Sequence, residues 1–156
     1  MNVNPVTNVS VIDEITLVSL DKVPNNTKIF AEIFTALANE NINIDMISQT
    51  SPYKGHLKVS FTISDHDLSK AIHILGKFRT TIPELRTEVN SNNCKLSVYG
   101  EAMKHIPGVA AKIFTLLSEN NIEIKLVTTS EVEISCLIDE KDAETAEAAI
   151  RKAFNI

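Results

Sequence analysis

Some residue types are scarce in this chain of 156 residues, and each scarcity excludes a class of protein. It has no Trp, two Cys and four Gly. The glycines lie far apart along the chain, whereas a nucleotide phosphate cradle needs clustered glycines for close backbone approach. The chain alone is therefore not expected to be an enzyme. Cys94 and Cys136 lack a C-x-x-C spacing, so we expect both to be buried, reduced thiols.

Basic runs, aromatic stripes and long apolar segments are also missing. The net charge of −5 argues against a nucleic-acid or anionic-membrane partner, since either needs a basic face. Aromatic residues make up 5% of the chain, too few for stacking RNA bases on a sheet. No apolar run approaches the roughly 20 residues of a membrane helix, and the N-terminus lacks a secretory signal. These absences predict a cytoplasmic protein.

The four histidines have no metal-ligand spacing, so no metal and no cofactor is expected. They are His56, His66, His73 and His105.

An internal repeat is the main positive signal. The run E-I-F-T-A-L at 32–37 matches K-I-F-T-L-L at 112–117, and N-I-N-I at 41–44 matches N-I-E-I at 121–124. The offset of 80 residues extends back to a match of 16–18 with 96–98. It falls to 75 at Val59 and Ile134, after a longer hairpin tip in the first copy. The chain therefore contains one design twice.

Each copy has the periodicity of strand, helix, strand, strand, helix. In the first copy we expect strands over 15–20, 42–46 and 57–63, because apolar residues there are continuous or alternate. Helices are expected over 29–37 and 68–75, where apolar residues fall on one face. Alternation over 85–89 adds a fourth strand. The expected fold class is α+β, with βαββαβ ferredoxin-like units whose helices cover one face of an antiparallel sheet.

The second copy lacks its fourth strand, because only Asn155 and Ile156 follow its last helix. Val6, Val9 and Val11 form a short strand pattern with no place in the first copy. We therefore expect the N-terminal strand to complete the second domain, which covers an otherwise unpaired edge. The predicted domains are 13–90, and 1–12 plus 91–156, with the first inserted in the second.

Four segments resemble the paired ACT domains at the C-terminus of aspartate kinases. Segment 23–34 is similar to that family's V-P-D-K-P-G-V-A-A-K-I-F, and 41–47 to its N-I-N-I-D-M-I. Segment 107–114 resembles P-G-V-A-A-K-x-F, and 129–135 resembles T-S-E-I-x-I-S. The resemblance implies a regulatory tail or small regulatory subunit that senses lysine or threonine for feedback control. It also implies one ACT domain inserted in the other.

In such domains the resemblance implies an effector at a domain interface, with its carboxylate on the turn before the first helix. Three residues depart from the family: Asn25 replaces an Asp, Lys28 stands where the second copy has a glycine, and Glu123 replaces an Asn. The implied effector-binding residues are Asn25, Asn26, Thr27, Lys28, Ile29, Phe30, Asn43, Ile44, Gln49, Glu123 and Ile124.

Simpler interpretations stay open for the same residues. Asn25, Asn26 and Thr27 are suited to turns and helix caps, and Gln49 to an exposed strand position. An alternative function is therefore a free-standing double-ACT oligomerisation protein with altered or lost ligand binding. Expected partners are a second copy in a homodimer through sheet edges, an aspartate kinase catalytic chain and a small amino acid.

Overall fold

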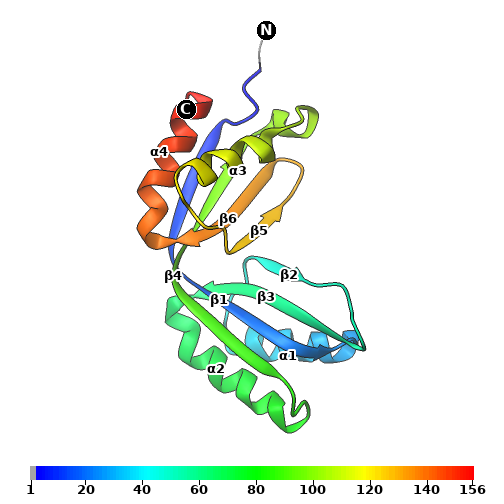
Figure 1. The fold of residues 1–156 in the computed structure, drawn as a ribbon. Helices are drawn as coiled ribbons and strands as arrows, with labels where there is room; N and C mark the ends of the chain where they lie inside the picture. Colours follow the sequence, from blue (N-terminus) through cyan, green and yellow to red (C-terminus); the bar gives the residue numbers. More distant parts are fainter. Residues whose placement is uncertain (1–2) are drawn as a thin grey trace. The chain divides into compact units, whose positions relative to one another are not determined.

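The computed structural model describes residues 3–156, and these divide into two compact units. One comprises Glu14–Ser91 and is called here the first-copy unit; the other combines residues 3–13 with Asn92–Ile156 and is called the second-copy unit. Two long strands, β1 (Asn8–Pro24) and β4 (Arg86–Tyr99), run from one unit into the other (Figure 1). The sequence patterns predict separate short strands in these places, whereas each strand continues through both units.

The first-copy unit has four strands in the order β2-β3-β1-β4. Its helices α1 and α2 lie on one face of the sheet (Figure 1). Along the chain it contains part of β1, then α1 (Thr27–Asn39), β2 (Ile47–Gln49), β3 (His56–Ser64), the short turn η1 (Asp65–Asp67), α2 (Leu68–Lys77), the turn η2 (Phe78–Thr80) and the start of β4.

The second-copy unit has the order β1-β4-β6-β5, with α3 and α4 on one face of its sheet (Figure 1). Its N-terminal segment contributes the β1 strand, and the backbone N–H of Thr7 donates to the Tyr99 carbonyl at 2.8 Å. The remaining elements are the end of β4, η3 (Glu101–His105), α3 (Val109–Glu119), β5 (Leu126–Thr129), β6 (Glu133–Asp139), η4 (Glu140–Asp142) and α4 (Ala143–Phe154). The predicted α+β class with two ferredoxin-like repeats is confirmed.

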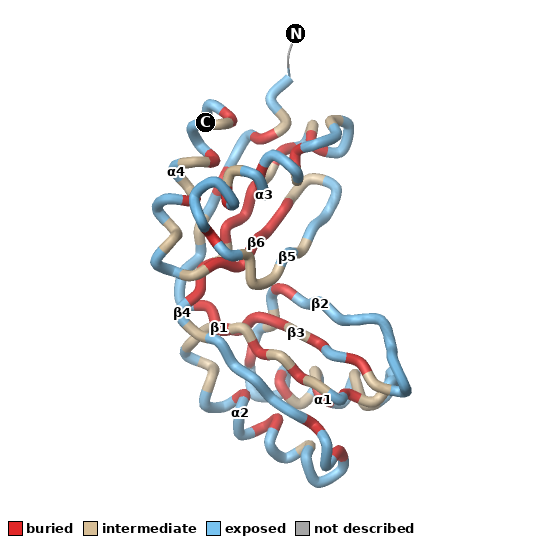
Figure 2. The backbone as a smooth tube through the Cα atoms, viewed as in Figure 1, coloured by how far each residue is buried: buried red, intermediate tan, exposed pale blue. Residues whose placement is uncertain are grey.

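Each unit buries its own apolar core between its sheet and its two helices. In Figure 2 the central strands and the inner helix faces are buried, while the outer helix faces are exposed. Phe61 of β3 is fully buried in the first-copy core, and its ring meets the edge of Phe34 at 5.3 Å between centroids. Val6 and Val9 are buried in the second-copy core, together with Cys94 and Cys136.

In both repeats an asparagine in the left-handed conformation lies two residues after the end of the first helix. Asn41 has φ 58° and Asn121 has φ 56°. Asn tolerates this conformation better than most residues because its short side chain bonds locally. The following amides then bond backward: Ile42 N–H to the Leu37 carbonyl at 3.1 Å, and the equivalent bond in the second copy at 2.9 Å. The repeated Asn-Ile dipeptide is therefore a helix stop.

The strand predicted over 42–46 is wrong, because β2 contains only Ile47–Gln49. Ile42 and Met46 are buried, as their alternation predicted, but both lie outside the regular ladder of β2 with β3. Instead both Asp45 and Met46 bond to Thr62 of β3: the Asp45 amide donates to the Thr62 carbonyl at 3.2 Å, and the Thr62 amide donates to the Met46 carbonyl at 3.0 Å. The Met46 amide donates to the Thr62 hydroxyl at 2.9 Å, so the regular ladder with β3 begins only at Ile47. Alternating burial arises here from an extended segment that leaves the helix and crosses the core edge.

The repeat offset also changes within the first strand. Val18 pairs with Phe61, and Leu96 pairs with Cys136, so the equivalent strand positions differ by 78 rather than by 80. The expected match of 16–18 with 96–98 is therefore displaced by one inward-facing position. The second copy has two more residues than the first between this strand and the following helix, in the segment that contains η3, and this restores the offset of 80.

Candidate functional site

A hollow of about 270 Å³ with polar and apolar lining residues lies at the N-terminus of α1 in the first-copy unit. This is just below the roughly 300–1,000 Å³ of pockets for drug-sized ligands, which suits a ligand of amino-acid size. The residues that line it come from the turn before α1, from α1 itself, and from the adjoining edges of β2 and β3. They are Pro24, Asn25, Asn26, Thr27, Phe30, Gln49 and Leu57.

The turn is held by the tip of the β2–β3 hairpin. The Asn25 amide donates to the Gly55 carbonyl at 2.9 Å. Lys54 and Gly55 both have positive φ, at 50° and 79°, which is the geometry of a two-residue hairpin turn. Tyr53 and His56 close that turn with two backbone hydrogen bonds. The hairpin tip that distinguishes the first copy therefore fixes the wall of the hollow.

The N-terminus of α1 is capped by its own chain. Asn26 Oδ1 accepts hydrogen bonds from the amides of Lys28 at 2.9 Å and Ile29 at 3.3 Å. The Phe30 amide donates to the Asn26 carbonyl at 3.1 Å. These are the amides that a carboxylate would otherwise meet at a helix N-terminus. Two of the helix donors at the hollow are therefore already engaged.

Five of the predicted effector-binding residues line this hollow, and the others of the first copy do not. Lys28 is exposed within the first turn of α1, and Ile29 packs partly against the core. Asn43 is exposed, and Ile44 is half-buried against the same core. The hollow lies at the start of α1, whereas residues 43–44 follow the end of that helix. They therefore lie outside the hollow.

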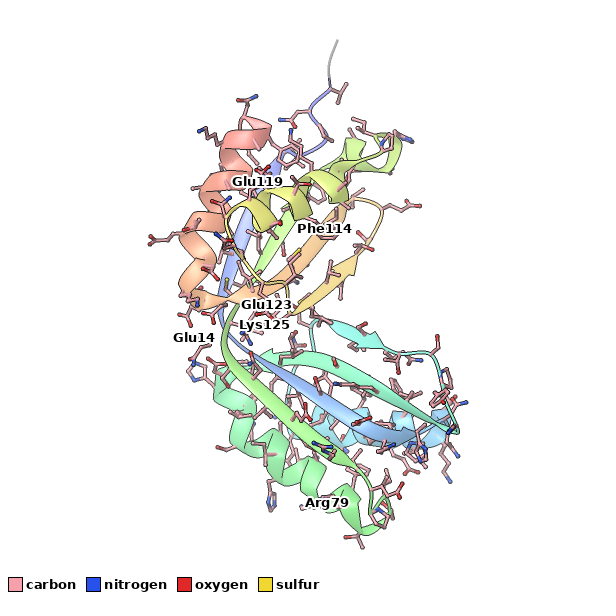
Figure 3. All side chains as sticks on the ribbon, in the orientation of Figure 1. Glu14, Arg79, Phe114, Glu119, Glu123 and Lys125 are labelled. Atoms are coloured by element: carbon pink, nitrogen blue, oxygen red, sulfur yellow. The ribbon has the colours of Figure 1, made fainter. Side chains whose placement is uncertain are left out.

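Glu123 and Ile124 belong to the second-copy unit, on the connection between α3 and β5 (Figure 3). Glu123 is exposed, and Ile124 packs partly against the second-copy core. Lys125 follows on the same connection, with its ammonium 3.9 Å from the Asp139 carboxylate. The part that Glu123 and Ile124 take in effector binding stays a prediction.

The two repeats begin their first helix differently. In the second copy Gly108 has φ +89° at the N-cap of α3, with no side-chain cap. In the first copy Asn26 is the N-cap, at φ −142°, and Lys28 lies inside the helix. The first-copy helix, which has no glycine here, starts two residues earlier relative to the repeat and has a side-chain cap.

Two lining residues were not predicted. Pro24 directly precedes the predicted turn, and Leu57 starts the alternating run of β3 on the helix side. The sequence contains a signal for Leu57, because its parity with Val59 places it under α1. Among residues 3–156 no group of three His, Cys, Asp or Glu is placed to hold a metal ion. Nor does any helix within that range have the length and apolarity to cross a membrane.

The ACT domain family model matches residues 18–77 and 96–154. The aspartokinase of Bacillus sp. (strain MGA3) is 34% identical over 144 residues, which cover 92% of this chain and 35% of that protein. The aspartokinase of Helicobacter pylori (strain ATCC 700392 / 26695) is 36% identical over 139 residues, covering 89% of this chain and 34% of that protein. The chain thus spans about a third of the curated relatives it matches.

Two solved structures resemble the fold over nearly its whole length. A crystal structure of aspartokinase alpha and beta subunits aligns with a TM-score of 0.87 at 34% identity, covering 97% of this chain and 99% of that one. The ligand-free regulatory subunit of aspartate kinase from Thermus thermophilus aligns with a TM-score of 0.83 at 28% identity, covering 96% and 99%.

Proposed function

We propose that this chain, which belongs to the ACT domain family and is the regulatory region of an aspartokinase, binds a small amino acid, lysine or threonine, as a feedback effector. Through its ACT domains it forms a homodimer in the cytoplasm and controls an aspartokinase catalytic chain. By itself it catalyses no reaction. The observation that supports effector binding most directly is the hollow formed by Asn25, Thr27 and Gln49 at the start of α1.

The chemistry of the hollow suits a zwitterion. Gln49 and Asn25 offer amide oxygens to an ammonium group, and the Thr27 hydroxyl can donate to a carboxylate. Phe30 and Leu57 supply an apolar wall for the side chain of the ligand. Because Asn25 carries no charge, its attraction for an ammonium group is weaker than that of a carboxylate. We therefore expect modest affinity, with selectivity set by the size of the hollow.

Calorimetric titration of the purified chain with lysine, threonine and methionine tests the proposal. Gln49→Ala should weaken binding by about 0.5–1.5 kcal/mol, the net value of a neutral hydrogen bond. Asn25→Asp should tighten it, because a carboxylate makes a charge-assisted bond to the ammonium group. Ser48→Ala is the matched control. Ser48 is next to Gln49 on β2 and pairs with Ser60. Because successive strand residues point to opposite faces, its side chain lies on the sheet face opposite to that of Gln49. If binding is saturable and its dissociation constant is the same in the Gln49 and Asn25 variants, the site lies elsewhere.

The contribution of the second copy is tested separately. Glu123→Gln removes a charge but keeps the shape, and we expect it to weaken binding by about 1–3 kcal/mol if Glu123 holds the effector's ammonium group. Lys28→Gly tests whether a glycine at this position improves binding, and no effect is expected from the Lys28 side chain itself, which lies outside the hollow.

A second candidate function is a double-ACT oligomerisation protein with altered or lost ligand binding. The observation in its favour is the Asn26 cap, which occupies two amides that a carboxylate would need. This function would be favoured over effector sensing if no amino acid gave a heat of binding in the titrations and the chain still associated with a kinase chain.

We also propose domain bounds of 13–90, and of 1–12 with 91–156. The buried Val6 and Val9 in the second-copy core support this arrangement. The polypeptide 13–90 expressed alone should fold cooperatively, whereas 91–156 should require residues 1–12. Folding of 91–156 without that segment would contradict the insertion.

A further inference from the structure

The outer face of α4 carries a charge pattern that its counterpart α2 lacks. Glu144, Ala148 and Lys152 are all exposed and are spaced four residues apart. Residues at this spacing form one ridge on a helix surface. The ridge is acidic at its N-terminal end, small in its middle and basic at its C-terminal end.

The repeat provides an internal comparison for this ridge. The offset of 75 continues into the second helix of each copy, because Leu68 begins α2 and Ala143 begins α4. The equivalent exposed ridge of α2 therefore has no acid at its start and a large residue in its middle, and it consists of Ser69, His73 and Lys77. The shared fold does not require the pattern of α4.

The ridge borders a groove of about 710 Å³ between α3 and α4. The α4 side is made mostly of small residues, and Leu116 of α3 gives an apolar wall. The lining residues are Leu116, Asn120, Thr145, Ala148, Ala149, Lys152 and Ala153. The distance at which two helices pack is set by the side chains at their contact. Alanines at this place therefore allow another helix to approach closely.

We propose that this surface binds a second copy of the chain, with the two α4 helices antiparallel about a two-fold axis at Ala148. Glu144 and Lys152 each lie about 6 Å along the helix from Ala148, at 1.5 Å per residue. An antiparallel partner then places its Lys152 opposite Glu144 and its Glu144 opposite Lys152. One residue pair thus gives two intermolecular ion pairs, as an isologous interface requires. A parallel partner would place like charges together.

The charges needed for this contact are available. Within residues 3–156, neither Glu144 nor Lys152 forms an ion pair with its own chain. The neighbouring Arg151 is engaged inside the unit, because it bonds to Glu147 at 3.1 Å and to the Val9 carbonyl at 3.3 Å. The helix therefore separates its structural arginine from an outward lysine that a partner can reach.

The contact goes beyond effector binding and does not depend on it. It uses helices, so it leaves the edge strands β2 and β5 open for the homodimer proposed above. A surface of one helix and one groove is small, and small contacts are weak and transient. We therefore expect association to depend on protein concentration and to fall with added salt.

Sedimentation velocity from low to high micromolar protein tests the contact. Lys152→Glu turns both ion pairs into repulsions and should raise the dissociation constant of this step about tenfold or more. The swap of Glu144→Lys with Lys152→Glu should restore association, because the reversed ridge is again self-complementary. Lys77→Glu, at the equivalent position of α2, is the matched control and should change nothing. Circular dichroism checks that each variant is folded.

Two outcomes would overturn the proposal. One is association that Lys152→Glu leaves unchanged or that the charge swap does not restore. The other is a Lys152→Glu variant that self-associates normally but binds an aspartokinase catalytic chain more weakly, which would assign the groove to that chain.

Discussion

Replacing Asn26 tests how the first-copy helix is started and what occupies its N-terminus. Asn26→Ala removes the acceptor of two amide hydrogen bonds, at 2.9 and 3.3 Å, while water can still reach the exposed turn. N-cap losses of this kind cost about 0.5–2 kcal/mol, and an exposed cap belongs in the lower half of that range. For a unit of this size, 1 kcal/mol shifts the melting temperature by roughly 4–8 °C. We expect Asn26→Ala to lower the melting temperature of the first-copy unit by about 2–10 °C. Asn26→Gly should cost only a few tenths of a kcal/mol, since glycine is an acceptable N-cap.

The assay combines thermal melting with amide hydrogen exchange. In Asn26→Ala the amides of Lys28 and Ile29 should exchange faster, while those at the start of α3 serve as an internal control, because Gly108 gives that helix no side-chain cap. Asn26→Gly should also increase the affinity for the effector's carboxylate, because it frees both amides without a large loss of stability. Unchanged exchange at Lys28 and Ile29 in Asn26→Ala would refute the cap, and weaker effector binding in Asn26→Gly would refute the competition.

Three further predictions concern packing and titration. Gly100→Ala should destabilise the second-copy unit by about 1–3 kcal/mol, because an added Cβ would lie 1.7 Å from the Pro5 carbonyl oxygen; Gly76→Ala, in open space on α2, should stabilise by about 0.5–1 kcal/mol in the same urea titration. Burial raises the pKa of Cys136 from 9.0 to about 11, so the unfolded thiol ionises first, and stability should be full below pH 9 and fall as pH rises from 9 towards 11; a Cys136→Ser variant with the same fall would contradict this. Asn121→Ala should cost about 1 kcal/mol at its left-handed backbone position, whereas Asn121→Gly should cost nothing; equal melting temperatures would argue against the cap.

The sequence by itself determined the repeat, the α+β class and the family. The offsets of 80 and 75 are properties of the chain, and they reappear as equivalent helices because each copy buries the same apolar face. The Asn-Ile stop after each first helix is equally local, since it depends on what Asn41 and Asn121 can adopt in φ. The resemblance to the ACT tail of aspartate kinases is confirmed. The buried cysteines were also predicted correctly.

Tertiary structure decided how the candidate site is assembled and which segments pair as strands. Alternation over 42–46 reflects burial, but β3 supplies the hydrogen-bond partners. Thr62 accepts from both the Asp45 and the Met46 amide, so the regular ladder starts only at Ile47. Lys28 and Asn26 could not be assigned from the repeat alone, because a side-chain cap competes with the glycine turn of the second copy. The outcome depends on where the hairpin tip at Gly55 holds the turn. Local patterns fix what a segment can bury, whereas the partner of each backbone group is chosen by segments distant in the chain.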